Sequence, residues 1–397
     1  ADDAAVGEGQ GRLVGQGGAR LITMDGYGDG LAASFDVLDE RAERLPSPGY
    51  SPALVYGAVT RLLGFREGEE GKVTGLAASG DPARLSDFFE HLLRWGACDP
   101  RAGGDEGRAR LRAASREDVA AGLQAALEAT VLGEIKRRLE PGASMAVAGG
   151  LFANVALNRR LSEHAGHLAV FPHMGDGGLC VGAAVALSGP VPFDHAFHGP
   201  TWPEAAVERA VRESGLPAAR SQDPEGELAK AIIAGEIVGR WLGRSEFGPR
   251  ALGHRSILAR GDRTGRLARL NEALARDDFM PFAPVRRHGA GTWSMTVAFA
   301  ADEALREGAP AVVHKDGTVR TQLANSVRDP GLWRLLERTE DAGLPAIVNT
   351  SFNRHGEPIV ESPSDAIATF RAAGLDRLQL GDWILTRGNL STAGAPV

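Results

Sequence analysis

The sequence predicts a mixed α/β protein with two domains, an α/β region followed by an α+β region. Its 397 residues are enough for two or three domains of ordinary size. In the first half, apolar runs end in glycine-rich turns and lead into helical patterns. In the second half, helices and strands follow one another without that repeated unit. The proline-rich segment 191–203 lies between the two patterns and is the predicted linker.

Each element of the first region is predicted from its own pattern. Residues 1–19 are glycine-rich, polar and without period, which predicts disorder. Residues 51–65 have apolar side chains three and four positions apart, with Ser51 as N-cap and Pro52 in the first turn, which predicts a helix. The other expectations are strands at 21–25, 31–40, 144–150 and from 168, a loop at 96–115, and helices at 116–140, 151–163 and 179–189.

The second region is expected to begin near residue 204. Its periodicity predicts helices at 204–214 and 225–234. The predicted strands are 236–243, 292–300, 309–314, 345–348 and 380–386.

Composition narrows the class of protein. The formal net charge of −7 argues against a general nucleic-acid binder, which would carry a clustered basic surface. No run of 18 apolar residues is present, so no membrane span is expected. Two cysteines, Cys98 and Cys180, are too few for a disulfide framework, and the first residues lack the apolar core of a signal peptide. We therefore expect a cytoplasmic protein.

Aspartates follow two of the predicted strands. Asp25 and Asp29 lie in MDGYGDG (24–30), and Asp176 lies in GDGG after another strand. Asp25 and Asp176 are hard oxygen ligands that can meet across a cleft and bind a divalent cation. Two carboxylates do not complete a metal site, and the alternative is ordinary Asp-Gly turn chemistry.

Glycines at a second strand end indicate an anion-binding turn. Gly149 and Gly150 join a strand to a helix, where backbone N–H groups and the helix dipole attract phosphate. Asn154 and Asn158 share one face of that helix. Lys72 lies in a segment that contains glycines. It is either a contact for an anion or a solvated residue at the start of a helix.

Arginines cluster in the second region. The segment GRWLGRSEFGPRALGHRSILA (239–259) carries Arg250 and Arg255, and guanidinium groups on a Gly/Pro-rich loop suit phosphate or carboxylate. Arg320 follows DGTV, and VNTSFNRHGEP adds the neutral or cationic donors Asn349, Ser351 and Arg354. The alternative is turn chemistry and a solvated arginine face.

Together these segments, in this order, resemble the nodulation-protein and cephalosporin-biosynthesis O-carbamoyltransferase family over about residues 20–390. The resemblance implies a partial actin-like (ASKHA, threonylcarbamoyl-transferase-like) domain over 20–190. It implies a YrdC-like domain over 204–397 that forms carbamoyl adenylate from carbamoyl phosphate and ATP. The first domain would then transfer the carbamoyl group to a hydroxyl of a small-molecule or sugar acceptor.

The resemblance also implies residue roles. Asp25 and Asp176 match the family's ligands for a divalent metal, iron or another ion. The residues that match the adenylate segment are Gly149, Gly150 and Asn154. The candidates for carbamoyl phosphate and nucleotide in the second domain are Arg250, Arg255 and Arg320, which are also the catalytic candidates, with Asn349, Ser351 and Arg354. Lys72 matches a motif to which no role is assigned.

Two departures from the family pattern affect the expected activity. In the family, a histidine pair, HxxxH, lies about twenty residues before the aspartate that matches Asp25 and supplies two metal ligands. Here residues 2–6 stand at that place, and no histidine precedes His91. Met280 stands where the family usually has arginine. The expectation is an N-terminally truncated enzyme with impaired transfer. The alternatives are a catalytically inactive remnant that binds nucleotide and an actin-like small-molecule kinase.

Overall fold

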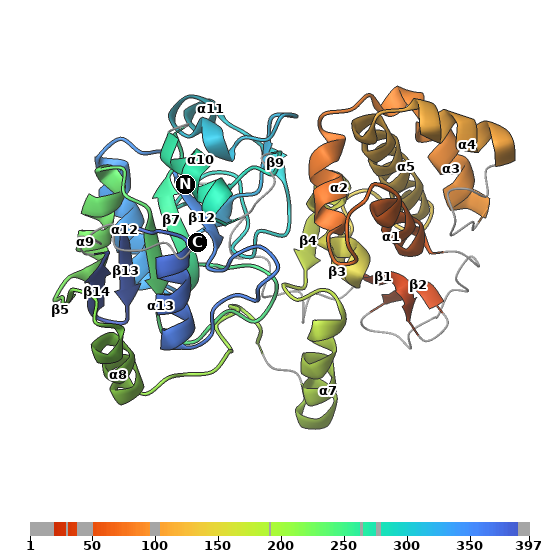
Figure 1. Ribbon diagram of the computed structural model, residues 1–397. Coiled ribbons are helices and arrows are strands. Elements are labelled where there is room, and N and C mark those ends of the chain that lie inside the picture. The colour runs from red at the N-terminus through yellow and green to blue at the C-terminus, as the bar shows by residue number, and fades with distance from the viewer. Residues whose placement is uncertain are drawn as a thin grey trace. The chain divides into compact units, whose positions relative to one another are not determined.

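The computed structural model describes residues 20–28, 31–37, 51–95, 104–189, 192–262, 265–274 and 279–387, and these form two compact units (Figure 1). Unit 1 holds the chain up to Asp194 together with the segments 296–299 and 314–320. Unit 2 holds residues 195–295, 300–313 and the chain from Thr321. The expectations for residues 1–19 and for Asp29 lie outside the described residues.

Unit 1 is built on a four-stranded sheet with the order β2-β1-β3-β4. β2 is antiparallel to β1, whereas β1, β3 and β4 are parallel, so their carboxyl ends share one edge. Its strands are β1 (Arg20–Gly28), β2 (Leu31–Val37), β3 (Ser144–Ala148) and β4 (His167–Val170). Its helices are α1 (Pro52–Leu62), α2 (Glu70–Ala77), η2 (Pro82–Arg84), α3 (Ser86–Trp95), α4 (Gly104–Ala113), α5 (Arg116–Lys136), η4 (Gly150–Ala153), α6 (Val155–His164), η5 (Asp176–Gly178) and α7 (Leu179–Ser188).

Helix α5 is the centre of the helical layer in unit 1. It contacts α2, α3, η2 and α6, and most of its apolar side chains are buried. Gly122 permits a close approach to Leu85, because a Cβ there would lie 2.7 Å from the Cβ of Leu85. Local signals set the ends of these helices: Ser51 caps α1 by accepting from the Leu54 N–H, and Ser115 caps α5.

Unit 2 contains a mixed eight-stranded sheet with the order β11-β8-β12-β7-β6-β13-β14-β5, and β9 and β10 form a separate two-stranded sheet. The strands of the eight-stranded sheet are β5 (Ala218–Arg220), β6 (Val238–Trp241), β7 (Arg255–Arg260), β8 (Ala283–Arg286), β11 (Gln322–Leu323), β12 (Ile347–Ser351), β13 (Arg377–Leu380) and β14 (Trp383–Thr386). Of the two-stranded sheet, β10 (Thr318–Val319) lies in the 314–320 segment of unit 1, and β9 (Phe299–Ala300) begins at the last residue of the 296–299 segment of unit 1. The helices that follow residue 203 are α8 (Glu204–Ser214), α9 (Pro224–Ile233), α10 (Gly265–Ala273), α11 (Glu303–Gly308), η6 (Pro310–Val312), α12 (Pro330–Asp341) and α13 (Pro363–Ala372).

Helices α9 and α12 pack together and cover one face of the eight-stranded sheet. Leu228 and Ile232 of α9 and Leu335 of α12 are buried in one apolar cluster with Val238 of β6 and Ile347 of β12. Side chains alternate between faces along a strand, so Arg240, two residues after Val238, lies on this same face. An arginine therefore lies within a layer that is otherwise apolar.

Two short segments from the second half of the chain fold with unit 1. The Asn158 amide of α6 donates to the main-chain oxygens of Phe152 (2.7 Å) and Thr296 (2.8 Å). The Ala298 N–H donates to the Val155 oxygen, and His314 Nε2 is 2.9 Å from the Gly75 oxygen. The predicted second domain was one continuous segment, 204–397, and these buried main-chain contacts are the reason that the structure divides it differently.

The mixed α/β class predicted from the sequence is confirmed. The helix predicted at 204–214 is α8, and the first two predicted strands are β1 and β2. The loop predicted at 96–115 was wrong because it contains helix α4 from Gly104, and the strand predicted at 309–314 was wrong because it is the short helix η6, which begins at Pro310. The strand predicted at 292–300 is formed only at Phe299–Ala300, and the one predicted at 380–386 is divided by the turn between β13 and β14. Across the described residues, no helix is long and apolar enough to cross a membrane.

Replacing Asn158 tests the attachment of the 296–299 segment to unit 1. Asn158→Ala leaves two main-chain oxygens without their donor, and we expect a loss of about 1–3 kcal/mol in the free energy of unfolding. Arg159→Ala, which removes only an exposed ion pair with Glu163, is the control and should cost less than about 1 kcal/mol. Urea unfolding followed by circular dichroism measures both, and equal effects would contradict this role of Asn158.

Candidate functional site

The carboxyl edge of the unit 1 sheet brings three predicted segments together. Gly149 has a φ of +106°, and a Cβ there would lie 2.0 Å from the Met24 oxygen, so only glycine fits. A Cβ on Gly150 would lie 3.1 Å from Asp25 Oδ1, and one on Gly175 would lie 4.0 Å from the Gly150 Cα. The glycine pair thus lies against the Asp25 carboxylate, with Gly175 on its other side.

The donors at this edge do not complete a metal site. Asp25 Oδ1 accepts from the Gly26 N–H at 2.6 Å, and Asp176 begins η5 as an exposed residue directly after Gly175. Among the described residues, no group of three or more His, Cys, Asp or Glu side chains is placed to hold a metal ion. The two carboxylates supply hard oxygen donors, but we assign no chemical step to a metal.

The Asn154 side chain is used within unit 1. It caps α6 by accepting from the Leu157 N–H at 3.0 Å, and its amide pairs with the Gln124 amide of α5. Gln124 in turn accepts a hydrogen bond from the Tyr56 hydroxyl. Burial raises the pKa of Tyr56 well above its usual value. Lys72 lies on α2, with its amine 2.8 Å from Glu69. Because the Asn154 side chain is already bonded, it could contact an adenylate as predicted only through its main chain, or if its side-chain amide left Gln124.

The arginine-rich segment of unit 2 forms an irregular loop between β6 and β7. One oxygen of Glu246, Oε1, accepts three main-chain N–H groups at the far end of this loop, from Leu252 (2.7 Å), His254 (2.8 Å) and Arg255 (3.2 Å). The loop therefore closes on its own carboxylate, with Pro249 and Arg250 between the two ends. The sequence analysis did not select Glu246.

The carbonyl groups of the same loop are held by three buried side chains. Asn349 of β12 donates to the Ala251 oxygen at 3.2 Å, and Gln322 of β11 donates to the Leu252 oxygen at 2.6 Å. Arg240 of β6 donates to the Gly253 oxygen at 2.7 Å. Because consecutive carbonyls bond to different strands, the loop has one well-defined conformation although it contains no regular secondary structure.

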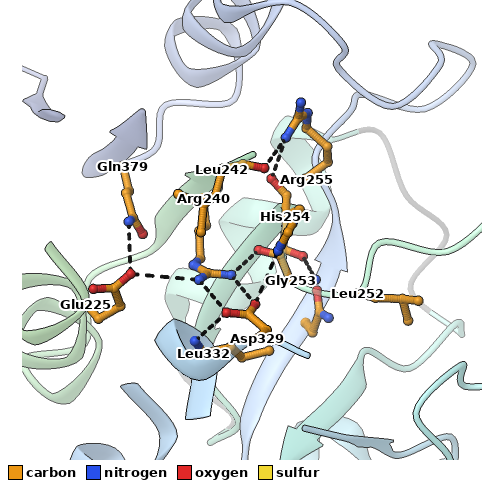
Figure 2. Close-up of polar contacts among 12 residues, drawn as sticks. Glu225, Arg240, Leu242, Leu252, Gly253, His254, Arg255, Asp329, Leu332 and Gln379 are labelled. Carbon is orange, nitrogen blue, oxygen red and sulfur yellow. Dashed lines mark hydrogen bonds and ion pairs between the residues drawn. The ribbon is translucent and has the colours of Figure 1, made fainter. Parts of the chain in front are cut away.

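A buried ion pair lies beneath the loop, as Figure 2 shows. Both terminal nitrogens of Arg240 donate to the Asp329 carboxylate, at 2.7 and 3.1 Å, and Glu225 of α9 is 4.0 Å away. The side chains of Arg240 and Asp329 are 0% and 7% exposed. The arginine lowers the pKa of Asp329 to about 2 against the opposing effect of burial, so this carboxylate stays ionised.

His254 lies beside this ion pair as a neutral imidazole. Burial lowers its pKa, and the charge of Arg240 lowers it further. Its Nδ1 is 2.7 Å from the Arg244 oxygen and therefore carries the proton, and its ring stacks on Phe197 with centroids 3.7 Å apart. The Nε2 atom is 3.7 Å from Asp329 Oδ2. His254 thus stabilises the loop through its hydrogen bond to Arg244 and its packing on Phe197.

Arg250 differs from every other arginine of the loop. Its side chain is half-buried, and among the described residues it makes no hydrogen bond or ion pair. Burial lowers its pKa to about 10, so it is charged at neutral pH, and no described residue supplies a counter-charge. A desolvated, unpaired guanidinium is destabilising by itself and is stabilised by a bound anion.

Arg255 does not present its donors to an anion, contrary to the prediction. Its side chain is completely buried, and its terminal nitrogens donate to the main-chain oxygens of Leu242, Gly243 and His254. Its guanidinium carbon lies 4.2 Å from the centre of the Trp241 ring. Asn349 is likewise 1% exposed, and its amide supports Ala251. Both residues hold the loop in place.

The remaining predicted residues are more exposed or lie elsewhere. Ser351 is half-buried at the end of β12, in register with Ser256. Arg354 is exposed and lies 3.7 Å from Glu357. Arg320 belongs to the segment that folds with unit 1, whereas Arg250 belongs to unit 2. Met280 is half-buried. Within unit 2, the structure thus leaves Arg250 as the predicted arginine with an unused, desolvated charge.

The structure thus describes a mixed α/β protein in which the loop between β6 and β7 is held in one conformation by buried side chains. Residues 16–185 match the family described as carbamoyltransferase N-terminus, and residues 229–387 match carbamoyltransferase C-terminus. The chain is 31% identical to nodulation protein NolO of Bradyrhizobium diazoefficiens over 92% of this chain and 75% of that protein. The chain belongs to the carbamoyltransferase family, a family of transferase enzymes.

Other relatives include enzymes with named acceptors. The chain is 30% identical to nodulation protein NolNO of Sinorhizobium fredii, over 94% of this chain and 61% of that protein. It is 28% identical to the 3'-hydroxymethylcephem-O-carbamoyltransferase of Streptomyces clavuligerus, over 80% of this chain and 64% of that protein. The chain thus spans between three fifths and three quarters of these relatives. The solved structure of HypF is similar over 44% of this chain and 22% of that chain, at 18% identity, with a TM-score of 0.27 that is too low to define a fold.

Two matched aspartates test the buried ion pair. Asp329 and Asp223 each cap a helix, precede a proline and pair with an arginine, but the Asp223–Arg338 pair is exposed. Asp329→Asn removes the main counter-charge of the buried Arg240 and leaves only Glu225 at 4.0 Å, and we expect it to destabilise unit 2 by about 3–5 kcal/mol. Asp223→Asn should cost less than about 1 kcal/mol. Guanidinium unfolding distinguishes them, and similar losses would contradict the importance of burial.

The same pair predicts a pH dependence. The pKa of Asp329 is lowered from 3.8 to about 2 on folding, so the unfolded chain binds this proton first. Its contribution to stability is present above the unfolded pKa and is lost as the pH falls through 4 towards 2. The difference in unfolding free energy between the wild type and Asp329→Asn should shrink as the pH falls from 4 towards 2. A difference that stays the same over this range would contradict this assignment.

Proposed function

We propose that this protein is an O-carbamoyltransferase in which unit 2 forms carbamoyl adenylate and unit 1 transfers the carbamoyl group. The proposal follows from membership of the family and from one observation, the half-buried guanidinium of Arg250, which has no partner among the described residues and whose pKa burial lowers. Carbamoyl phosphate and ATP are both polyanions, so a site that brings them together needs cationic groups that are not already neutralised.

In the proposed activation step, carbamoyl phosphate, ATP and water give carbamoyl adenylate, pyrophosphate and inorganic phosphate. Water would cleave the bond between the carbamoyl and phosphate groups, which releases carbamate and inorganic phosphate. A carbamate oxygen would then attack the α-phosphorus of ATP, and the bond to the β-phosphate would break to release pyrophosphate. Arg250 would bind the phosphate of carbamoyl phosphate. The loop that carries Arg250 would keep this charge in position, so that no reorganisation is needed during the reaction.

In the proposed transfer step, an acceptor hydroxyl attacks the carbamoyl carbon, AMP leaves, and the hydroxyl proton is released. The glycine pair Gly149–Gly150 at the carboxyl edge of the unit 1 sheet would accept the adenylate through its main-chain N–H groups. Asp25 and Asp176 would be two oxygen ligands of a divalent metal, with the others supplied from outside the described residues. The acceptor is a small molecule or sugar. The actin-like and YrdC-like folds for the two units remain part of this proposal.

Replacing Arg250 tests the activation step. The full chain should exchange labelled pyrophosphate into ATP only when carbamoyl phosphate is present. Arg250→Ala should raise the KM for carbamoyl phosphate about 10- to 100-fold, because a charge-assisted hydrogen bond is lost. Arg209→Ala, an exposed arginine on α8, is the matched control and should leave exchange unchanged.

Two results would overturn the proposal. One is the absence of exchange from folded wild-type protein, and nucleotide binding without exchange would then favour a non-catalytic binding protein. The other is an Arg250→Ala variant with unchanged kinetics. A phosphorylated acceptor in place of a carbamoylated one would indicate a kinase.

A further inference from the structure

Glu246 interacts with the loop through a single oxygen atom. Three N–H groups, from Leu252, His254 and Arg255, converge on Oε1 within 3.2 Å. The other oxygen, Oε2, is buried and has no hydrogen-bond partner among the described residues. Bonds to an ionised carboxylate are stronger than bonds between neutral groups, so this side chain is the main attachment of the N–H groups at this end of the loop.

The two sides of the loop backbone are supported unequally. The carbonyl oxygens of residues 251–253 are bonded by Asn349, Gln322 and Arg240, which come from three different strands. Loss of one of these donors leaves the other two in place. The N–H groups of residues 252, 254 and 255 share the Glu246 acceptor, so its loss releases all three at once.

Glu246 is not placed to bind a substrate anion itself. Its Oε1 is already occupied by three donors and its Oε2 is buried. A carboxylate would also repel a phosphate group. Any effect of Glu246 on an anionic substrate therefore passes through the conformation of the loop, and Arg250 is two residues from the first bonded N–H group.

We infer that Glu246 is a positioning residue that fixes the loop conformation from which Arg250 binds the anionic substrate. This inference rests on the proposed function and names a residue that acts on the same site. A loop fixed before binding loses little conformational entropy when the anion binds, whereas a released loop must be ordered at that moment. Loss of Glu246 should therefore weaken binding of the anion while the sheet beneath stays folded.

The test compares Glu246→Ala and Glu246→Gln in the full chain. Glu246→Ala should raise the KM for carbamoyl phosphate in pyrophosphate exchange about 10- to 100-fold, as expected when a binding group is misplaced. Glu246→Gln keeps an oxygen acceptor for the three N–H groups and should restore most of the affinity. Glu236→Gln, at a half-buried glutamate paired with Arg377 at 2.6 Å, is the matched control and should change neither KM nor kcat.

A double-mutant cycle separates positioning from general stability. If Glu246 acts through Arg250, Glu246→Ala should have little further effect on KM in an Arg250→Ala background. Hydrogen exchange should also show faster exchange of the N–H groups of residues 252, 254 and 255 in Glu246→Ala, with the strands unchanged. Equal factors in both backgrounds, or no gain in exchange at these N–H groups, would overturn the inference.

These outcomes are distinguishable from failure of the proposed function. If the wild type shows no exchange, the cycle is measured by calorimetry with inorganic phosphate. Phosphate binding that follows the same non-additive pattern supports the positioning role although the transfer chemistry is wrong. Wild-type protein that neither exchanges pyrophosphate nor binds phosphate overturns both.

Discussion

The ion pair between Arg240 and Asp329 is the interaction on which the structure of unit 2 depends. Arg240 lies on β6 near the centre of the sheet, and Asp329 is the N-cap of α12. Arg240 also donates to the Gly253 oxygen, so the pair connects the sheet, the helix and the loop. Gly253 has a φ of +123°, and a Cβ there would lie 3.1 Å from the Asp329 carboxylate and 3.3 Å from Arg240. Glycine therefore lets the loop approach the ion pair closely enough for its carbonyl to take one of the arginine's hydrogens.

A buried polar network of this kind adds little net stability to a fold, because its groups lose their hydration. An ion pair loses most of its Coulomb attraction to desolvation, and well-packed apolar side chains are often as stable. What the network provides is a single loop conformation, because the hydrogen bonds that these side chains make to the loop backbone can form together in only one arrangement. In unit 2, Glu246, Gln322, Asn349 and Arg240 all bond to the same few residues, and the loop holds the one desolvated arginine that has no partner among the described residues.

The sequence predicted the parts of the fold that depend on local patterns. Ser51 with Pro52 marks a helix start, and the glycines at 149–150 mark a strand end, whatever lies around them. The arginine segment also predicted anion binding, but not which arginine is unpaired. Arg240, Arg250 and Arg255 are alike in sequence and differ only in tertiary contacts, because the partners of Arg240 come from residues 225, 253 and 329. Glu246 was missed for the same reason, since its role is visible only when the loop closes.

The two units carry complementary chemistry. Unit 1 ends its parallel strands in the carboxylate of Asp25 and in glycines that allow close backbone approach, whereas unit 2 supplies a cation on a rigid loop. A carboxylate-lined strand edge suits hard cations or a neutral group to be transferred, and a desolvated guanidinium suits a phosphate. In the proposed reaction, the cation of unit 2 would bind carbamoyl phosphate, and the strand edge of unit 1 would bind the adenylate through main-chain N–H groups. We therefore expect loss of the Arg250 charge to affect activation first, and changes at the strand edge of unit 1 to affect transfer first.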